Sequence, residues 1–359
     1  MTVIEQILDL ARWAPSGDNT QPWRFEIKSD DHAIVHGFDT RDSVVYDFLG
    51  RASQVSLGAL IETISIAGSQ HGLRASVERR TGTPPTQPTF DVHFQPDASV
   101  RPDPLIESIR ARSVQRRRLS TRPLDPAQKS ALERSIGKGF RISWLEGFRD
   151  RVRTALLLSA NSRIRLSMPE AFTVHREVIQ WDAQYSDDRI PDRALGLDPL
   201  TIRLMKWAMH SWDRVNFLNR YLGGTVAPRV QMDLVPGVAC AAHFAIHAPN
   251  EAREIDDFVA AGRAVQRFWL TGTQLGLQMQ PEYTPLVFAS YVRAGVRFSK
   301  VPVLWDDARK LTARLEDLLG KEAVERAVFM GRIGAGAAPV SRSLRVSLEK
   351  LRWVERDHA

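Results

Sequence analysis

The chain has 359 residues, of which 43% are hydrophobic and 25% are charged, as in ordinary folded proteins. This length is about twice that of a common domain, so one large fold or two fused halves is expected. No apolar run approaches the ~18 residues of a membrane span, and the single cysteine, Cys240, excludes an internal disulfide, so a cytoplasmic protein with no membrane partner is expected. The net charge of +7 is compatible with binding of nucleic acid or of an anionic small ligand. Charge alone does not distinguish between these two kinds of partner.

The first predicted element is an amphipathic helix, because Ile4, Ile7, Leu8 and Ala11 recur at helical spacing. It ends before Pro15, within a run that reads Ala-Pro-Ser-Gly-Asp-Asn-Thr-Gln-Pro-Trp over residues 14–23. The run is dense in turn formers and in amide and hydroxyl side chains. It is therefore expected to form a polar loop at the mouth of a pocket.

This run closely resembles the Ala-Pro-Ser-Ser/Gly-x-Asn-x-Gln-Pro-Trp signature of the nitroreductase-like flavoprotein family. The resemblance implies an α/β (α+β) nitroreductase-like fold in which the loop lies against the flavin ring of FMN. The loop residues that the resemblance assigns to FMN binding are Pro15, Ser16, Gly17, Asn19 and Gln21.

Beyond the loop, the sequence predicts strands near 23–28 and 32–38, a long helix near 51–71 closed by Gly72, and strands near 74–80 and 89–95. The long helix has a second copy. Gly58, Gly68 and Gly72 align without gaps on Gly262, Gly272 and Gly276. Small residues on one helix face indicate close approach of another backbone, so we expect an internal repeat.

The segment Arg-Pro-Asp-Pro at 101–104 is interpreted as a linker between an N-terminal half, residues 1–100, and a C-terminal half, residues 101–359. In ordinary nitroreductase-like proteins an Arg-Ser opening precedes the Pro-Ser loop, and a second subunit completes the site. Here that order is reversed. The layout resembles the duplicated branch of the family, in which two units form a pseudo-dimer within one chain.

Residues 109–118 are predicted to lie in the first helix of the second half and carry several arginines. A nucleic-acid interface would normally add an aromatic or groove-entering motif, and none is legible, so no nucleic-acid partner is expected. The run resembles the Arg-x-Ser-x-x-Arg opening that grips the FMN phosphate, which implies roles for Arg112, Ser113 and Arg116. After the late strand near 329–334, the resemblance implies a further phosphate ligand at Arg342, with Arg345 in reserve.

Residues 277–283 follow the second copy of the helix, where the family lays backbone amides against the flavin N5 edge. Pro281 and Glu282 are assigned to cofactor binding there, with Glu282 a marker of position rather than a proton donor.

Other chemistry finds little support in the sequence. Cys240, His243 and His247 have the spacing of metal ligands, but 237–247 is interpreted as a buried strand on which they would not share a face, so no metal is expected. The glycines at 334 and 336 lack the context of a dinucleotide loop, and no nucleophile elbow occurs. No side chain is therefore assigned a catalytic role, and the chemistry is attributed to the cofactor.

The expected function is that of an FMN-dependent oxidoreductase, in which hydride passes from NAD(P)H through flavin N5 to an electron-poor organic acceptor. The alternative is a protein that sequesters or senses FMN with little turnover. That alternative rests on residues 181–205, whose prolines, glycine and acidic residues disfavour a continuous helix while Trp181, Tyr185, Ile190 and Leu195 supply apolar anchors. This segment is predicted to form a lid over the flavin.

Overall fold

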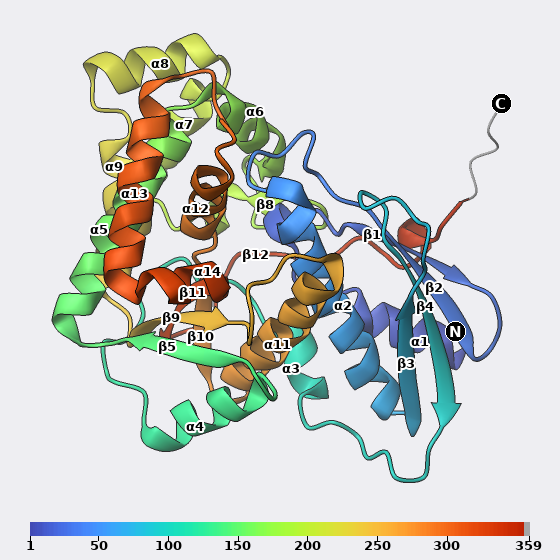
Figure 1. The fold of residues 1–359 in the computed structure, drawn as a ribbon. Helices are drawn as coiled ribbons and strands as arrows, with labels where there is room; N and C mark the ends of the chain where they lie inside the picture. Colours follow the sequence, from blue (N-terminus) through green and yellow to red (C-terminus); the bar gives the residue numbers. More distant parts are fainter. Residues whose placement is uncertain (355–359) are drawn as a thin grey trace.

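The computed structural model describes residues 1–354 and contains two four-stranded antiparallel sheets with helices between and around them (Figure 1). The chain begins with the predicted amphipathic helix. Thr2 and Glu5 cap the N-terminus of this helix with a reciprocal capping box. The first sheet and its helices comprise α1 (Val3–Ala11), β1 (Trp23–Ile27), β2 (His32–Gly37), α2 (Arg51–Ser69), β3 (Leu73–Arg79) and β4 (Thr89–Pro96). These bounds agree closely with the predicted ones.

The second sheet has the same topology as the first. It is formed by β5 (Arg141–Leu145), β9 (Ala242–His247), β10 (Leu277–Pro281) and β11 (Ala327–Ala335). The strand orders are β1-β2-β4-β3 and β5-β9-β11-β10, and each sheet has one long helix, α2 or α11 (Ile255–Gln274), between its second and third strands in the chain. The overall class is thus α+β, with two sheets of matching connectivity.

The helices α2 and α11 cross where each has a glycine. A Cβ atom on Gly58 would lie 2.0 Å from the carbonyl oxygen of Val259, and one on Gly262 would lie 2.0 Å from the carbonyl oxygen of Val55. Such distances leave no room for any side chain. The aligned glycines noted in the sequence therefore mark the contact between the two helices.

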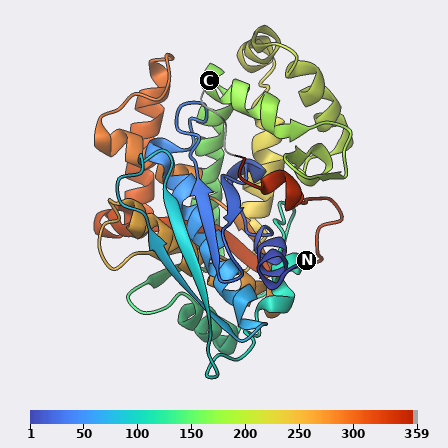
Figure 2. The same cartoon turned by 90° about the vertical axis from the view of Figure 1, so that its right-hand side faces the viewer.

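The molecule is layered around this crossing. The inner face of the first sheet packs on α1 and α2 through residues such as Val35, Phe90 and Val92. One face of the second sheet packs on α11 and α4 (Pro126–Ser135). Its other face packs on α5 (Gly147–Leu166), α12 (Thr284–Ala294) and α13 (Val303–Leu319). Figure 2 looks onto the outer face of the first sheet, where the strands lie in front of the helices.

A long insertion separates β5 from β9 and includes the predicted lid. Val230–Leu234, designated η4, is a π-helical turn, which is rare and often found at functional sites. The remaining helices and strands of the insertion are α6 (Pro169–Val178), β6 (Ile179–Gln180), β7 (Tyr185–Ser186), β8 (Ile190–Pro191), α7 (Pro199–Ala208), α8 (Trp212–Tyr221), α9 (Val226–Arg229) and α10 (Val235–Val238).

After α14 (Lys321–Arg326) and β11, the chain returns to the first half (Figure 1). The short strand β12 (Arg342–Ser343) pairs in parallel with β7 of the lid segment. Farther on, the backbone N–H of Trp353 donates to the carbonyl of Phe25 on β1 at 2.8 Å. The C-terminal segment therefore fastens the lid segment and the first sheet to each other.

Two predicted elements are wrong. The helix expected over 109–118 is α3 (Ile106–Ala111) and ends at Ala111, because the N–H of Gln115 donates to Met279 on β10 at 2.9 Å instead of continuing a helix. The strand expected over 237–247 begins only at Ala242, and α10 occupies its start. Within residues 1–354, no helix is both long and apolar enough to cross a bilayer.

Candidate functional site

The loop of residues 14–23 has an unusual backbone. Asp18, Asn19 and Gln21 have φ angles of 48°, 63° and 49°, in the left-handed region that non-glycine residues seldom enter. The turn is held locally, since the Ser16 hydroxyl accepts the N–H of Gln21 at 2.9 Å. Backbone strain of this kind persists where the surrounding structure enforces it, and it concentrates at functional sites.

The two amides of this loop contact the predicted lid. Asn19 Nδ2 donates to the carbonyls of Asp187 at 3.0 Å and Arg189 at 3.3 Å, and Gln21 Nε2 donates to Asp187 at 2.9 Å. Gln21 Oε1 accepts the N–H of Val346 at 3.0 Å, and Asn19 Oδ1 is buried without a partner. The side chains of Asn19 and Gln21 therefore join the loop, the lid segment and the C-terminal segment.

The other predicted loop residues remain accessible. Pro15 and Ser16 are half-buried, and Gly17 is exposed. A Cβ atom added to Gly17 would meet no atom within 4 Å, so the backbone here borders open space. This part of the loop leaves room for a planar ligand to approach the main chain.

Three arginines gather behind the loop. Arg112 Nη2 donates to the carbonyl of Trp13 at 2.8 Å, Arg345 Nε donates to Ala14 at 2.9 Å, and Arg342 Nη2 donates to the carbonyl of Arg112 at 3.1 Å. Arg112 also lies over the ring of Trp269, 4.6 Å from its centroid. We refer to Arg112, Arg342 and Arg345 as the arginine cluster.

The arginine cluster has positive charge without a carboxylate. Within residues 1–354, none of its members forms an ion pair, although Arg112 is only 3% exposed and Arg345 only 8%. Burial and mutual repulsion lower the pKa of Arg112 well below its usual value, and lower that of Arg345 to about 9. The Nε atoms of Arg112 and Arg342 are buried without partners. An anion such as a phosphate would relieve both the repulsion and the missing hydrogen bonds.

An extended segment leads from the arginine cluster to a cavity. Ser113 follows Arg112 and is half-buried, Val114 forms a bridge with Met279, and Arg116 lies on the cavity wall. Arg116 Nη1 donates to the carbonyl of Ala194 in the lid segment at 3.2 Å. Thus Arg112 and Arg116, predicted on one helix, lie instead at the two ends of an extended run that spans about 13 Å.

The cavity has a volume of about 60 Å³ and polar walls. Three buried side-chain atoms on these walls lack hydrogen-bond partners: Gln280 Oε1, Asp233 Oδ2 and Arg332 Nε. Native proteins seldom leave such atoms unpaired, so each points to a ligand or to water. The walls are formed by Arg116, Leu158, Met232, Asp233, Gln280, Pro281, Glu282 and Arg332.

Glu282, predicted as a marker of position, anchors a buried polar network. His243 Nδ1 lies 2.7 Å from Glu282 Oε2, and Arg332 Nη1 lies 3.0 Å from Glu282 Oε1. Burial opposes the charged form of His243, but the adjacent carboxylate outweighs it and raises the pKa of His243 to about 10. Because Glu282 pairs with both His243 and Arg332, this network can hold Pro281 and the end of β10 in a fixed position.

Cys240 and His243 share a hydrogen-bond partner, the carbonyl of Gly237, whereas His247 has other partners. His243 lies between Glu282 and the carbonyl of Gly237, whereas His247 contacts the carbonyl of Ala323 and the hydroxyl of Ser143. Cys240 is buried just before β9, and its Sγ donates to that carbonyl of Gly237 at 3.3 Å.

Sequence reasoning missed two charged residues near the cavity, Asp233 and Arg165, and gave no special ionisation to a third, Asp18 of the 14–23 run. Burial raises the pKa of Asp18 against the charges of Arg165 and Arg116, and it raises the pKa of Asp233 to about 6 against the charges of Arg165 and Arg332. Arg165 Nε is buried and unpaired. Asp18 belongs to the 14–23 run, whereas Asp233 and Arg165 lie in no recognisable motif, and only the tertiary fold brings them near each other and near Asp18.

These features fit FMN. The arginine cluster would hold its phosphate, the residues of the 14–23 loop would border its ring, and the unpaired atoms along the cavity would meet its polar edge. When bound, FMN would supply hydride-transfer chemistry that no side chain of this site offers.

The chain is similar in part to several known proteins. No family model matches the chain. An uncharacterized protein of Mycobacterium tuberculosis is 26% identical over 279 residues, or 77% of this chain and 38% of that protein. A second protein of that organism, provisionally named NAD(P)H nitroreductase acg, is 37% identical over 79 residues, or 21% of this chain and 23% of that protein. The matches thus span well under two thirds of these relatives' lengths.

Two solved structures are also similar over most of their length. The FMN-dependent nitroreductase NfnB of Mycobacterium smegmatis, in complex with NADPH, has a TM-score of 0.35 and 14% identity and covers 70% of this chain and 97% of its own. A nitroreductase of Bacteroides fragilis with bound FMN has a TM-score of 0.31 and 12% identity, with 72% and 97% coverage. The fold class, α+β, follows from the topology of the two sheets. The likeness to acg is a sequence similarity over 21% of this chain.

Proposed function

We propose that this protein is an FMN-dependent oxidoreductase of nitroreductase-like type that takes reducing equivalents from NAD(P)H and passes them to an electron-poor organic acceptor. The two fused halves assemble one flavin site within a single chain. The observation that carries the proposal is the arginine cluster, in which three arginines without a carboxylate partner lie directly behind the 14–23 loop. FMN is the flavin whose single phosphate suits such a cluster.

The asymmetry of the chain supports one FMN rather than two. The loop comes from the first half, whereas Arg112, Arg342 and Arg345 all come from the second. The topologically equivalent position on the other side of the α2–α11 crossing lacks a second such loop in the sequence. One complete set of contacts is therefore available per chain.

Flavin binding tests the proposal directly. The full chain should quench FMN fluorescence at a ratio near one, and should bind FMN at least about tenfold more tightly than riboflavin, which lacks the phosphate. The loaded protein should then be reduced by NADH or NADPH in stopped flow and reoxidised by a nitroaromatic acceptor. A protein with no affinity for FMN, or with equal affinity for riboflavin, contradicts the assignment.

The closed lid favours a second candidate, an FMN-binding protein with little turnover. Asn19 and Gln21 hold the carbonyl of Asp187 from two sides, and Arg116 holds that of Ala194. If the lid stays closed, the protein binds FMN with the affinity and ratio given above. Reduction of the bound FMN by NADPH is then slow, and its rate does not change when the acceptor is varied. The same stopped-flow experiment separates the two functions.

A further inference from the structure

The outer face of the first sheet has a cluster of potential metal ligands. In the antiparallel pair of β2 and β4, His32 lies opposite His93. Side chains alternate along a strand, so Asp91 points to the same face as His93, while Phe90, Val92 and Phe94 point into the core. Three side chains that can bind a metal are thereby presented together by two paired strands.

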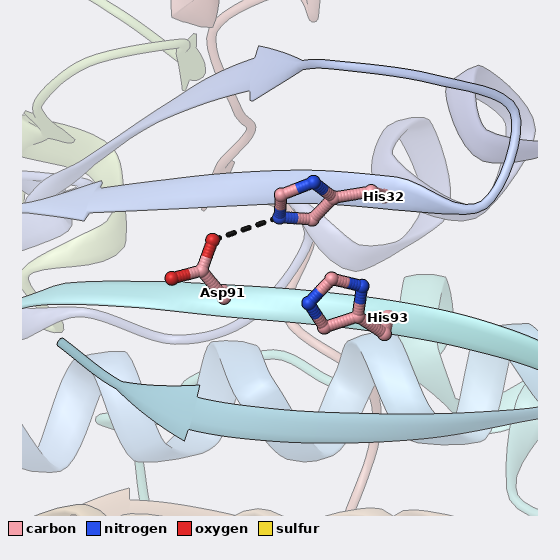
Figure 3. A group of neighbouring side chains, drawn as sticks. All are labelled: His32, Asp91 and His93. Carbon is pink, nitrogen blue, oxygen red and sulfur yellow. Dashed lines mark hydrogen bonds and ion pairs between the residues drawn. The ribbon is translucent and has the colours of Figure 1, made fainter.

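The three side chains are close enough to share one ion. His32 Nε2 lies 2.8 Å from Asp91 Oδ1, and one ligand atom from each of the three lies within 4.8 Å of the others. The two imidazole rings are stacked, with centroids 4.2 Å apart and an angle of 17° between their planes. Figure 3 shows that both rings direct a nitrogen toward the side on which Asp91 lies.

We propose that His32, Asp91 and His93 form a binding site for a divalent transition-metal ion of the Zn²⁺ type. Imidazole nitrogen and carboxylate oxygen are ligands that such ions bind at about 2.0–2.2 Å. In a tetrahedral site these bonds put ligand atoms about 3.4 Å apart. Small side-chain rotations reach that spacing from the separations present here. His93 is exposed, so water can fill the remaining coordination position.

Arg80 competes with the metal for the carboxylate of Asp91. Its Nε lies 2.6 Å from Asp91 Oδ2, and its Nη2 lies 2.8 Å from Asp91 Oδ1. A carboxylate is ionised at neutral pH, so Asp91 offers a charged oxygen to either cation, Arg80 or the metal. The Arg80 side chain is 41% exposed, and ion pairs of that kind contribute little stability, so Arg80 can release one oxygen to the metal.

This site is independent of the proposed flavin chemistry. It lies on the face of the first sheet opposite α2, and none of its residues belongs to the 14–23 loop, the arginine cluster or the cavity walls. Its occupancy should therefore not depend on FMN.

Zinc titration of the full, tag-free chain tests the proposal by calorimetry near neutral pH. The expected result is one Zn²⁺ per chain, with affinity lowered more than about tenfold by His93→Ala, because loss of even an outer-shell partner costs that much. Arg80→Gln should tighten binding severalfold, because it removes a competing cation. Neither exposed side chain is part of the core, so both variants should fold, as thermal unfolding will verify.

His36→Ala is the matched control. His36 lies on β2 with its ring 2.8 Å from a carboxylate, Glu26, but no second histidine faces it across the strands. This variant should bind zinc like the wild type. Absence of zinc binding by the wild type overturns the proposal, and so does an equal loss in His36→Ala and His93→Ala, since binding would then not require the three-residue cluster. Co²⁺ absorption bands that persist in His93→Ala would overturn it independently.

Discussion

A Cβ atom placed on Gly58 would lie 2.9 Å from the Cα of Gly262, and the reciprocal distance is also 2.9 Å. The two glycines therefore meet at equivalent positions of α2 and α11. Because Val55 and Val259 place their carbonyl oxygens directly above this contact, any side chain must push the helices apart. The junction of the two sheets depends on both residues having no side chain.

Gly58→Ala should accordingly destabilise the protein by about 2 kcal/mol or more, since overpacking of a close helix contact outweighs the better helix propensity of alanine. Gly68→Ala on the same helix is the control. Its Cβ would have its nearest neighbour at 3.5 Å, an ordinary contact, so it should be neutral or stabilising by up to about 1 kcal/mol. Urea unfolding of both variants measures the difference, and equal effects would contradict the packing argument.

Arg112→Ala should weaken FMN binding by ~30- to 1000-fold, the equivalent of about 2–4 kcal/mol for a charge-assisted phosphate contact in a buried site. Arg342→Ala and Arg345→Ala should act in the same direction. Arg118→Ala is the control, since Arg118 is exposed, and it should cost less than about 1 kcal/mol. Fluorescence titration measures the affinities. If Arg118→Ala weakens FMN binding as much as Arg112→Ala does, the arginines of this segment act only through their summed charge.

Asn19→Gly should loosen the lid, and its effect is measured on protein saturated with FMN. The substitution removes two hydrogen bonds to lid carbonyls, each worth about 1 kcal/mol, and glycine accepts the φ of 63° without strain. Reduction by NADPH, or sulfite addition to the flavin, should become about tenfold faster. Asp182→Gly serves as the control. It relieves the backbone strain of a comparable φ angle, 58°, in the lid segment and leaves the 14–23 loop unchanged. Rates that stay at the wild-type value would show that these bonds do not gate the cofactor.

The buried Asp233 makes a specific pH dependence testable. Burial raises its pKa to about 6 from 3.8, so the folded protein holds this proton more tightly than the unfolded chain does. The preference favours the folded state at acidic pH, and the favourable contribution is lost as pH rises through about 6. Asp233→Asn should therefore reduce the decline of the melting temperature between pH ~4 and pH ~6. The exposed Asp213→Asn is the control and should leave the profile unchanged.

The sequence was most informative where local geometry decides the structure. The loop at 14–23, the strands of the first sheet and the glycines of α2 and α11 follow from turn chemistry, alternation and small-residue spacing. Arg112 and Arg342 were predicted only through the family resemblance, and the structure brings both to the loop. How the lid gates the flavin and which residues bind it stay predictions.

Other features depend on contacts between distant segments, which no local pattern records. The arginines at 110–118 suggest a helix, but β10 draws the chain into an extended path after Ala111. Asp233 lines the cavity and Arg165 lies near Asp233 because a π-helical turn and a long helix pack together there. His32 and His93 are separated by the whole of α2 and β3, and only strand register shows that they are neighbours.

The order in which the arginine cluster is synthesised has a consequence for folding in the cell. Arg342 is added 230 residues after Arg112, so the ribosome exposes Arg112 long before its neighbours exist. Docking of the C-terminal segment then brings three like charges together and is opposed by their repulsion. A phosphate at that position would favour docking through its preference for the completed site. In this protein the flavin would therefore act as a late folding partner, and the supply of FMN during translation would influence how much of the chain reaches the native state.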